Sequence, residues 1–221
     1  MTVNITSDFD GGSVHCVSAE SPENILLELQ ADPVGGEIYW FYFRLSGARG
    51  QNCLIRMANA ADAFRLEERK ETDIPGPWIN YSACASYDRV TWFRVPTSFK
   101  DGHIEIAYKP TSDAIYFASF APYPQDRHSK LVTSVLESPH ASLEVLGKTP
   151  NGHDIELLTI GTSKEVGLAF WICARQHPSE TMAEWFAEGL LQRLIDRDDF
   201  LARKLLAQAT FYIAPCMNPD G

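Results

Sequence analysis

The sequence predicts a two-domain α+β protein, with an N-terminal antiparallel β-sandwich followed by an incomplete α/β domain built on a mixed sheet. The first half of the chain consists of short apolar or alternating runs separated by turn residues, whereas helical periodicity begins only after residue 124. The chain has 221 residues, 45% hydrophobic and 11% aromatic, so it can bury two cores. We therefore assign residues 1–124 to the sandwich and residues 125–221 to the α/β domain.

About seven strand-like segments fill the first domain, a number typical of an antiparallel sandwich. Turn signals such as Asp10-Gly11-Gly12 and Pro75-Gly76-Pro77 separate them. The run Trp40-Phe41-Tyr42-Phe43 could line a carbohydrate groove, but aromatic strands are more often buried in a sandwich core, and we expect burial here. The predicted strands cover residues 13–18, 25–29, 39–45, 52–57, 90–95, 103–108 and 114–121.

In the second domain, strand and helix patterns alternate. The apolar, aromatic run from Val166 to Ala174 is typical of a strand buried on both faces of a sheet. The order strand, helix, helix, strand implies at least partly parallel pairing. Two such strands and two helices do not close an α/β domain, so we expect the domain to be incomplete at Gly221. The predicted helices cover residues 129–137, 178–196 and 200–209, and the strands 143–146, 155–160, 166–174 and 210–214.

The charge balance argues against a nucleic-acid partner. The 19 Lys and Arg against 29 Asp and Glu leave a net charge of −10 and no basic stripe to neutralise phosphates. We expect the charged run from Arg65 to Glu71 to be a solvated loop. The start of the chain, Met1 to Asp8, lacks the features of a secretory signal, and no window is apolar enough to span a bilayer. We therefore expect no membrane partner.

The cysteines and the isolated histidines have plain structural interpretations. The cysteines are odd in number and scattered, which predicts reduced, buried thiols in a cytoplasmic protein. His15 and His103 lie within predicted strands and are expected to be structural. His128 and His140 follow Pro124 in polar sequence, and we expect them to be exposed. The cysteines are Cys16, Cys53, Cys84, Cys173 and Cys216.

A strand-to-helix corner at His177-Pro178-Ser179-Glu180 is the strongest candidate for a functional site. Pro178 suits the first position of a helix, where its missing N–H costs nothing. A His and a Glu three residues apart at such a corner can converge on one metal ion. The same spacing recurs at His153 and Glu156, but there it runs into a strand, where residues three apart point to opposite faces. We therefore expect only the first pair to share a ligand.

The stretch Ala174-Arg175-Gln176-His177-Pro178-Ser179-Glu180, followed by a helix, a strand and Asn218-Pro219-Asp220-Gly221, resembles the front half of zinc metallocarboxypeptidases. It is most similar to the cytosolic carboxypeptidase subfamily, whose corner reads A-R-x-H-P-G-E; Ser179 stands here in place of the usual Gly. That subfamily also carries an N-terminal β-sandwich, and Trp40 to Phe43 and Tyr116 to Tyr123 are similar to its signatures.

The resemblance implies roles for three residues. His177 and Glu180 match the first two ligands of one Zn²⁺. Asp220 matches a carboxylate that accepts the other N–H of the ligating imidazole and so fixes its tautomer and orientation. A plain turn residue in a P-D-G loop is the alternative for Asp220. The third zinc ligand, the general-base Glu, the catalytic tyrosine and the arginines for the substrate carboxylate would all follow Gly221, so this chain holds no complete catalytic set.

The function implied is zinc-dependent removal of the C-terminal residue, notably glutamate, from peptides or proteins, with the 221-residue chain itself inactive. One alternative is a zinc acyl-amino-acid hydrolase of the aspartoacylase or desuccinylase kind, which shares a related fold and an H-x-x-E corner. Such enzymes usually have Gly around the His, and the sandwich argues against them. Another alternative is a non-catalytic β-sandwich binding protein with a relic metal corner. The sequence indicates neither an oligomeric state nor substrate-binding residues.

Overall fold

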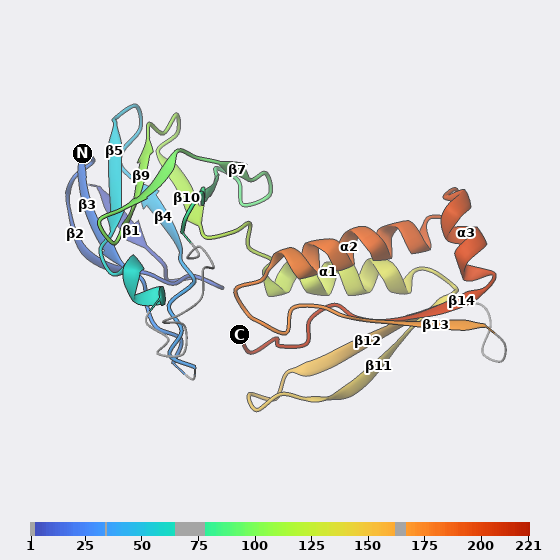
Figure 1. Ribbon diagram of the computed structural model, residues 1–221. Helices are drawn as coiled ribbons and strands as arrows, with labels where there is room; N and C mark the ends of the chain where they lie inside the picture. The colour runs from blue at the N-terminus through green and yellow to red at the C-terminus, as the bar shows by residue number, and fades with distance from the viewer. Residues whose placement is uncertain (1–2, 34, 65–77, 162–166) are drawn as a thin grey trace. The chain divides into compact units, whose positions relative to one another are not determined.

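The computed structural model describes residues 3–33, 35–64, 78–161 and 167–221. The chain divides into two compact units, Met1–Pro122 (unit 1) and Tyr123–Gly221 (unit 2), shown in Figure 1. The boundary expected after residue 124 lies two residues beyond this division. The charged run at residues 65–71 lies outside the described residues.

Unit 1 contains two sheets, each five-stranded in the described residues. Nearly all the pairings are antiparallel, as predicted, but β3 and β5 pair in parallel, so the second sheet is mixed. A short 3-10 helix, η1 (Ala60–Phe64), follows β5. The first sheet has the order β1 (Asn4–Thr6), β4 (Tyr42–Ser46), β10 (Ala114–Ala118), β6 (Cys84–Ser86) and β7 (Phe93–Arg94), and the second β2 (His15–Ser21), β3 (Asn24–Glu28), β5 (Cys53–Met57), β9 (His103–Tyr108) and β8 (Thr97–Lys100).

Both sheets of unit 1 contribute to one hydrophobic core. Phe43 of β4 stacks on Phe117 of β10 with ring centroids 5.5 Å apart, and the core continues into Ile55 and Ile104 of the other sheet. Alternate residues of β5 are buried, the two-residue period of a strand with one face in a core. Phe41, Tyr42 and Phe43 are at most 1% exposed. The prediction that the aromatic strand is buried in the core is therefore confirmed.

Unit 2 is a mixed sheet with helices. The strand order is β11 (Ala141–Lys148), β12 (Asp154–Ile160), β14 (Ala209–Ala214), β13 (Leu168–Cys173). The first two pairings are antiparallel, and β13 pairs with β14 in parallel, which confirms the expected mixed sheet. In Figure 1, α1 and α2 run side by side along the sheet. The helices are α1 (Gln125–Leu136), α2 (Met182–Ile195) and α3 (Phe200–Leu206).

Three sequence predictions about unit 2 are wrong in detail. The strand expected to be buried on both faces, β13, lies at the edge of the sheet, and Leu168 and Trp171 are 63% and 61% exposed because β14 is its one partner among the described strands. The long helix begins at Met182, not at Pro178, because residues 177–181 form turns. The first helix begins at Gln125 rather than at residue 129.

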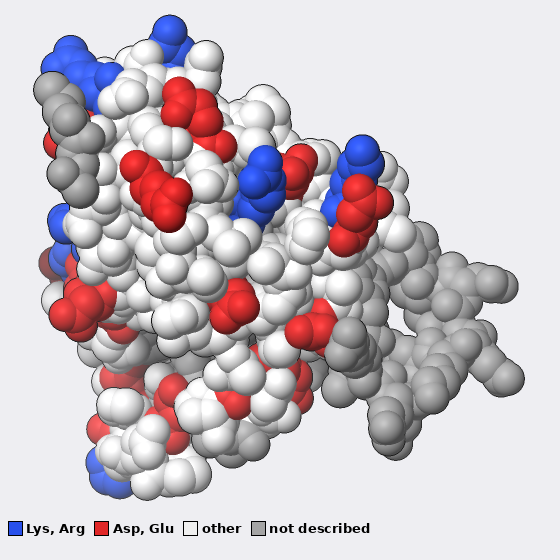
Figure 2. All heavy atoms as spheres, turned by 90° about the vertical axis from the view of Figure 1, so that its left-hand side faces the viewer, with Lys and Arg blue, Asp and Glu red and all other residues white. Residues whose placement is uncertain are grey.

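The surface charge, the length of the helices and the exposure of the cysteines relate to three further predictions from the sequence. Over the coloured part of the face in Figure 2, basic side chains lie scattered among acidic ones and form no stripe. Within the described ranges, no helix is long and apolar enough to cross a membrane. All the cysteines are free, but Cys16 and Cys173 are exposed, so the prediction of uniformly buried thiols is wrong. Cys173 is exposed because it ends the edge strand β13.

Candidate metal centre

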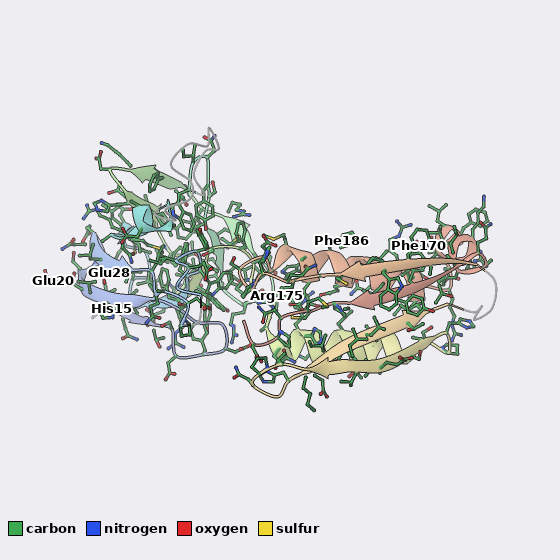
Figure 3. The ribbon with its side chains drawn as sticks, turned by 60° about the horizontal axis from the view of Figure 1, so that its bottom comes forward. His15, Glu20, Glu28, Phe170, Arg175 and Phe186 are labelled. Carbon is green, nitrogen blue, oxygen red and sulfur yellow. The ribbon has the colours of Figure 1, made fainter. Side chains whose placement is uncertain are left out.

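The corner forms where β13 leaves the sheet. Ala174 is the last residue held alongside β14: its N–H donates to the Ala214 carbonyl and its own carbonyl accepts from the Met217 N–H, both at 2.9 Å. Arg175 then takes a φ of 49°, in the left-handed region that L residues rarely adopt. Figure 3 shows Arg175 at this point, between the end of β13 and the start of α2. The backbone therefore turns sharply just before His177.

The two predicted ligands converge at this turn. Nδ1 of His177 lies 3.1 Å from Oε2 of Glu180, and their side chains are 74% and 54% exposed. A tetrahedral zinc bound at about 2.0–2.2 Å to each donor separates two donor atoms by roughly 3.3–3.5 Å, so the pair fits one ion with little adjustment. The same distance also fits an exposed ion pair. The geometry therefore permits zinc, and metal binding at these residues stays a prediction.

The loop at residues 218–221, called the closing loop from here on, lies against the corner that carries His177 and Glu180. The side-chain amide of Asn218 donates to the Gln176 carbonyl at 3.3 Å, and Gly221 packs so closely on Pro178 that an added Cβ would lie 2.2 Å from the proline ring. This placement brings the Asn-Pro-Asp-Gly segment next to the His177 turn, as the resemblance implied.

Asp220, however, does not contact His177 in this structure. Its carboxylate accepts hydrogen bonds from the Thr149 hydroxyl at 2.7 Å and the Asn151 N–H at 3.1 Å, and it lies 2.7 Å from Nδ1 of His153. Burial opposes ionisation, but these bonds together lower the pKa of Asp220. Asp220 therefore fastens the closing loop to the turn between β11 and β12. Its predicted role in orienting His177 stays a prediction.

The second H-x-x-E pair diverges, as its strand setting predicted. His153 is directed to Asp220, whereas Glu156 of β12 lies 2.8 Å from Nε2 of His128. The two side chains thus have separate partners. Within the described part of the chain, no group of three or more His, Cys, Asp or Glu residues is placed to hold a metal.

A buried ionic cluster beside the corner was missed by the sequence analysis. His128, expected to be exposed, lies in α1 and is 6% exposed because it faces α2 and β12. Its Nδ1 is 2.8 Å from Oε1 of Glu184, a carboxylate in α2 that is 1% exposed. Arg175 donates to the other oxygen of Glu184 at 2.5 Å. The sequence did contain a signal for this burial. His128 has the helical spacing to Leu131, Val132 and Val135, which form the buried face of α1.

Family comparisons cover nearly the whole chain. Residues 5–120 match the cytosolic carboxypeptidase N-terminal domain, and residues 131–221 match the zinc carboxypeptidase domain. An uncharacterised protein of Zymomonas mobilis is 39% identical over 221 residues, covering 100% of this chain and 55% of that protein. Mouse cytosolic carboxypeptidase 6 is 30% identical over 82% of this chain and 36% of its own length.

Solved structures agree in fold. The crystal structure of a metallo-carboxypeptidase from Burkholderia cenocepacia superposes with a TM-score of 0.92 at 45% identity, over 100% of this chain and 58% of that one. The chain thus spans 55% of the Zymomonas protein, 58% of the Burkholderia chain and 36% of the mouse protein.

Proposed function

Because the chain belongs to the zinc carboxypeptidase family, with the N-terminal domain of cytosolic carboxypeptidases, we propose that it forms the front part of a zinc-dependent enzyme that removes C-terminal residues from peptides or proteins. The observation that supports this most directly is the convergence of His177 and Glu180, 3.1 Å apart, within the segment that matches the catalytic domain. Cytoplasmic localisation is part of the proposal, from the names of the relatives.

His177 and Glu180 would hold the zinc, and their donor set of one imidazole nitrogen and one carboxylate oxygen suits this ion. When bound, zinc supplies Lewis-acid polarisation of the scissile carbonyl and a bound water of lowered pKa. The contribution of this chain is to hold the two donors in place: the backbone turns sharply at Arg175, two residues before His177, and the closing loop packs on Pro178.

We propose that the remaining parts of the site follow Gly221. A catalytic zinc has three protein ligands and one open position, and the described residues bring two candidates together, His177 and Glu180. The relatives it matches are nearly twice as long. A third ligand, a general-base Glu and arginines for the terminal carboxylate are therefore expected beyond residue 221, and residues 1–221 alone should bind zinc weakly and hydrolyse nothing.

The proposal is tested on the complete protein. Zinc content is measured after exhaustive dialysis, and hydrolysis is assayed on peptides that differ only in their C-terminal residue, with glutamate expected to be released fastest. His177→Ala and Glu180→Ala should abolish zinc retention and activity, while His140→Ala, in an exposed turn, should change neither. Zinc retention without any peptide cleavage but with hydrolysis of acyl-amino acids would favour the aspartoacylase alternative. Absence of zinc in the wild-type protein would favour a binding module and reject the proposal.

Asp220 is tested separately. Its loop packs on the corner, so a shift of its carboxylate from His153 to the His177 imidazole would give the orienting contact that the family resemblance implies. Asp220→Asn should then lower zinc affinity roughly 10–100-fold. His153→Gln is the matched control and should keep the wild-type zinc affinity, because it removes one of the three partners of Asp220 in this structure while leaving the carboxylate available. Unchanged zinc affinity in Asp220→Asn would restrict Asp220 to fastening the loop.

A further inference from the structure

The imidazole of His128 is held between two carboxylates. Nδ1 lies 2.8 Å from Oε1 of Glu184, and Nε2 lies 2.8 Å from Oε2 of Glu156. An ionised carboxylate only accepts hydrogen bonds, and a neutral imidazole carries a single N–H. Both contacts are therefore satisfied at once when His128 is an imidazolium.

Glu184 links this imidazolium to the corner. It is 1% exposed, and a buried carboxylate requires partners for both of its oxygens. His128 occupies Oε1 and Arg175 donates to Oε2. Cys216 and Tyr123 are further titratable groups near Glu184. Burial first and then the Glu184 charge raise the pKa of Cys216 to about 11, so it stays a neutral thiol. Burial is also the largest cause that raises the pKa of Tyr123, so its phenol stays neutral. The four residues His128, Glu156, Glu184 and Arg175 thus balance two positive and two negative charges.

Arg175 transmits the position of Glu184 to the backbone of the turn. Its Nη1 donates to the Tyr123 carbonyl at 2.9 Å, and its Nε donates to the Pro178 carbonyl at 3.2 Å. Pro178 directly follows His177, and the Arg175 backbone is itself in the left-handed region. The side chain of Arg175 therefore clamps the turn that presents His177 and Glu180.

We propose that His128 is a positioning residue for the metal corner, acting through Glu184 and Arg175 on the Pro178 carbonyl; this inference rests on the proposed zinc function. Burial alone would lower the pKa of His128, but the hydrogen bonds and charges of Glu184 and Glu156 raise it, in agreement with the imidazolium. A neutral imidazole could donate to only one of the two carboxylates, and removal of the imidazole would take away one of the two side chains that fix Glu184, so Glu184 would no longer hold Arg175 in one position.

The experiment measures zinc affinity in the complete protein by competition with a chromogenic chelator, at conditions where circular dichroism shows each variant folded. His128→Gln should bind zinc more weakly by up to about tenfold, because tenfold is the lower end of the effect for groups that hydrogen-bond directly to a metal ligand and His128 acts through two further side chains. His140→Gln is the matched control and should bind like the wild type. In a double-mutant cycle, His128→Gln should lower the zinc affinity of the Arg175→Gln variant only slightly further, because His128 acts on the corner through Arg175.

A second readout follows the imidazole itself. In protein labelled with nitrogen-15 at histidine, both ring nitrogens of His128 should carry protons at pH 7. A single protonated nitrogen there would overturn the proposal even if His128→Gln does not fold. So would wild-type zinc affinity in folded His128→Gln, or full additivity with Arg175→Gln. A failure of the proposed zinc function is distinguished by the His177→Ala control, which would then leave metal content unchanged.

Discussion

In unit 1 the buried polar side chains of the described residues are Ser86 and Ser119, whereas unit 2 buries His128, Thr181 and Glu184. The Ser119 hydroxyl accepts from the Phe41 N–H at 2.8 Å and so joins the residue after β10 to the residue before β4 without any charge. In unit 2 two of the three buried groups, His128 and Glu184, are ionisable, and Glu184 also pairs with Arg175 at the corner that carries the candidate ligands. Burial of charge is costly unless each group is paired, and pairing requires a defined geometry. The core of unit 1 is therefore held by apolar packing. In unit 2, paired charges also fix the position of the backbone turn at Arg175.

The largest expected effect is in the core of unit 1. Phe43 is fully buried and stacks on Phe117, so Phe43→Ala should lower the free energy of unfolding by about 3–5 kcal/mol. Urea unfolding followed by fluorescence measures this. Phe186→Ala, at a site that is 60% exposed in α2, is the matched control and should cost much less. Equal losses in the two variants would contradict the assignment of the core.

A change in the charge cluster should be somewhat smaller. Glu184→Leu leaves Arg175 and His128 without their shared carboxylate and should lower the free energy of unfolding of unit 2 by about 3 kcal/mol, since His128 can release its proton and relieve part of the cost. Glu144→Leu places the same change on the exposed face of β11 and serves as control. Stability equal to wild type in Glu184→Leu would show that the cluster is replaceable by apolar packing.

The pH dependence should separate the two units further. The pKa of His128 is raised in the folded state, so its imidazolium contributes stability that is fully present below the unfolded value, about 6.5. This contribution is lost as the pH rises through the raised folded value. The free energy of unfolding of unit 2 should therefore fall over that interval, and His128→Gln should remove the fall. An unchanged pH profile in His128→Gln would contradict the charged state of this histidine.

The smallest effect is expected at the exposed edge of unit 2. Leu168 of β13 is 63% exposed, so Leu168→Thr should change the free energy of unfolding by at most about 0.5 kcal/mol. It should, however, reduce self-association of residues 1–221, because an apolar edge strand is a template for pairing with another chain. Analytical ultracentrifugation measures this. A loss of several kcal/mol would mean that the side chain packs more tightly than its exposure indicates.

Much of the strand pattern of unit 1, and the convergence of His177 and Glu180, could be predicted from the sequence. Alternating burial has a two-residue period that is visible in the residues of β5, and the spacing of His177 and Glu180 at a strand end has few geometric outcomes. The edge position of β13 could not be predicted, since an apolar run gives no indication of how many partners the strand has.

The charge cluster was hidden for a different reason. His128 and Glu184 are 56 residues apart, and His128 and Glu156 are 28 apart, so no local pattern joins them. Asp220 likewise finds His153 across 67 residues. Long-range polar pairs of this kind depend on how α1 and α2 and the β11–β12 turn are placed, and that placement comes from packing rather than from periodicity.

The distribution of thiols gives each unit its own chemical reporter. Cys53 and Cys84 are buried in unit 1 and Cys216 in unit 2, and burial is the largest cause that raises the pKa of each, to about 11 for Cys53 and Cys216. A buried protonated thiol is unreactive toward alkylating reagents until its surroundings open. Pulse alkylation of residues 1–221 followed by peptide mass spectrometry should therefore time the opening of the two units independently. Exposed Cys16 and Cys173 should be modified before the buried thiols and serve as internal standards.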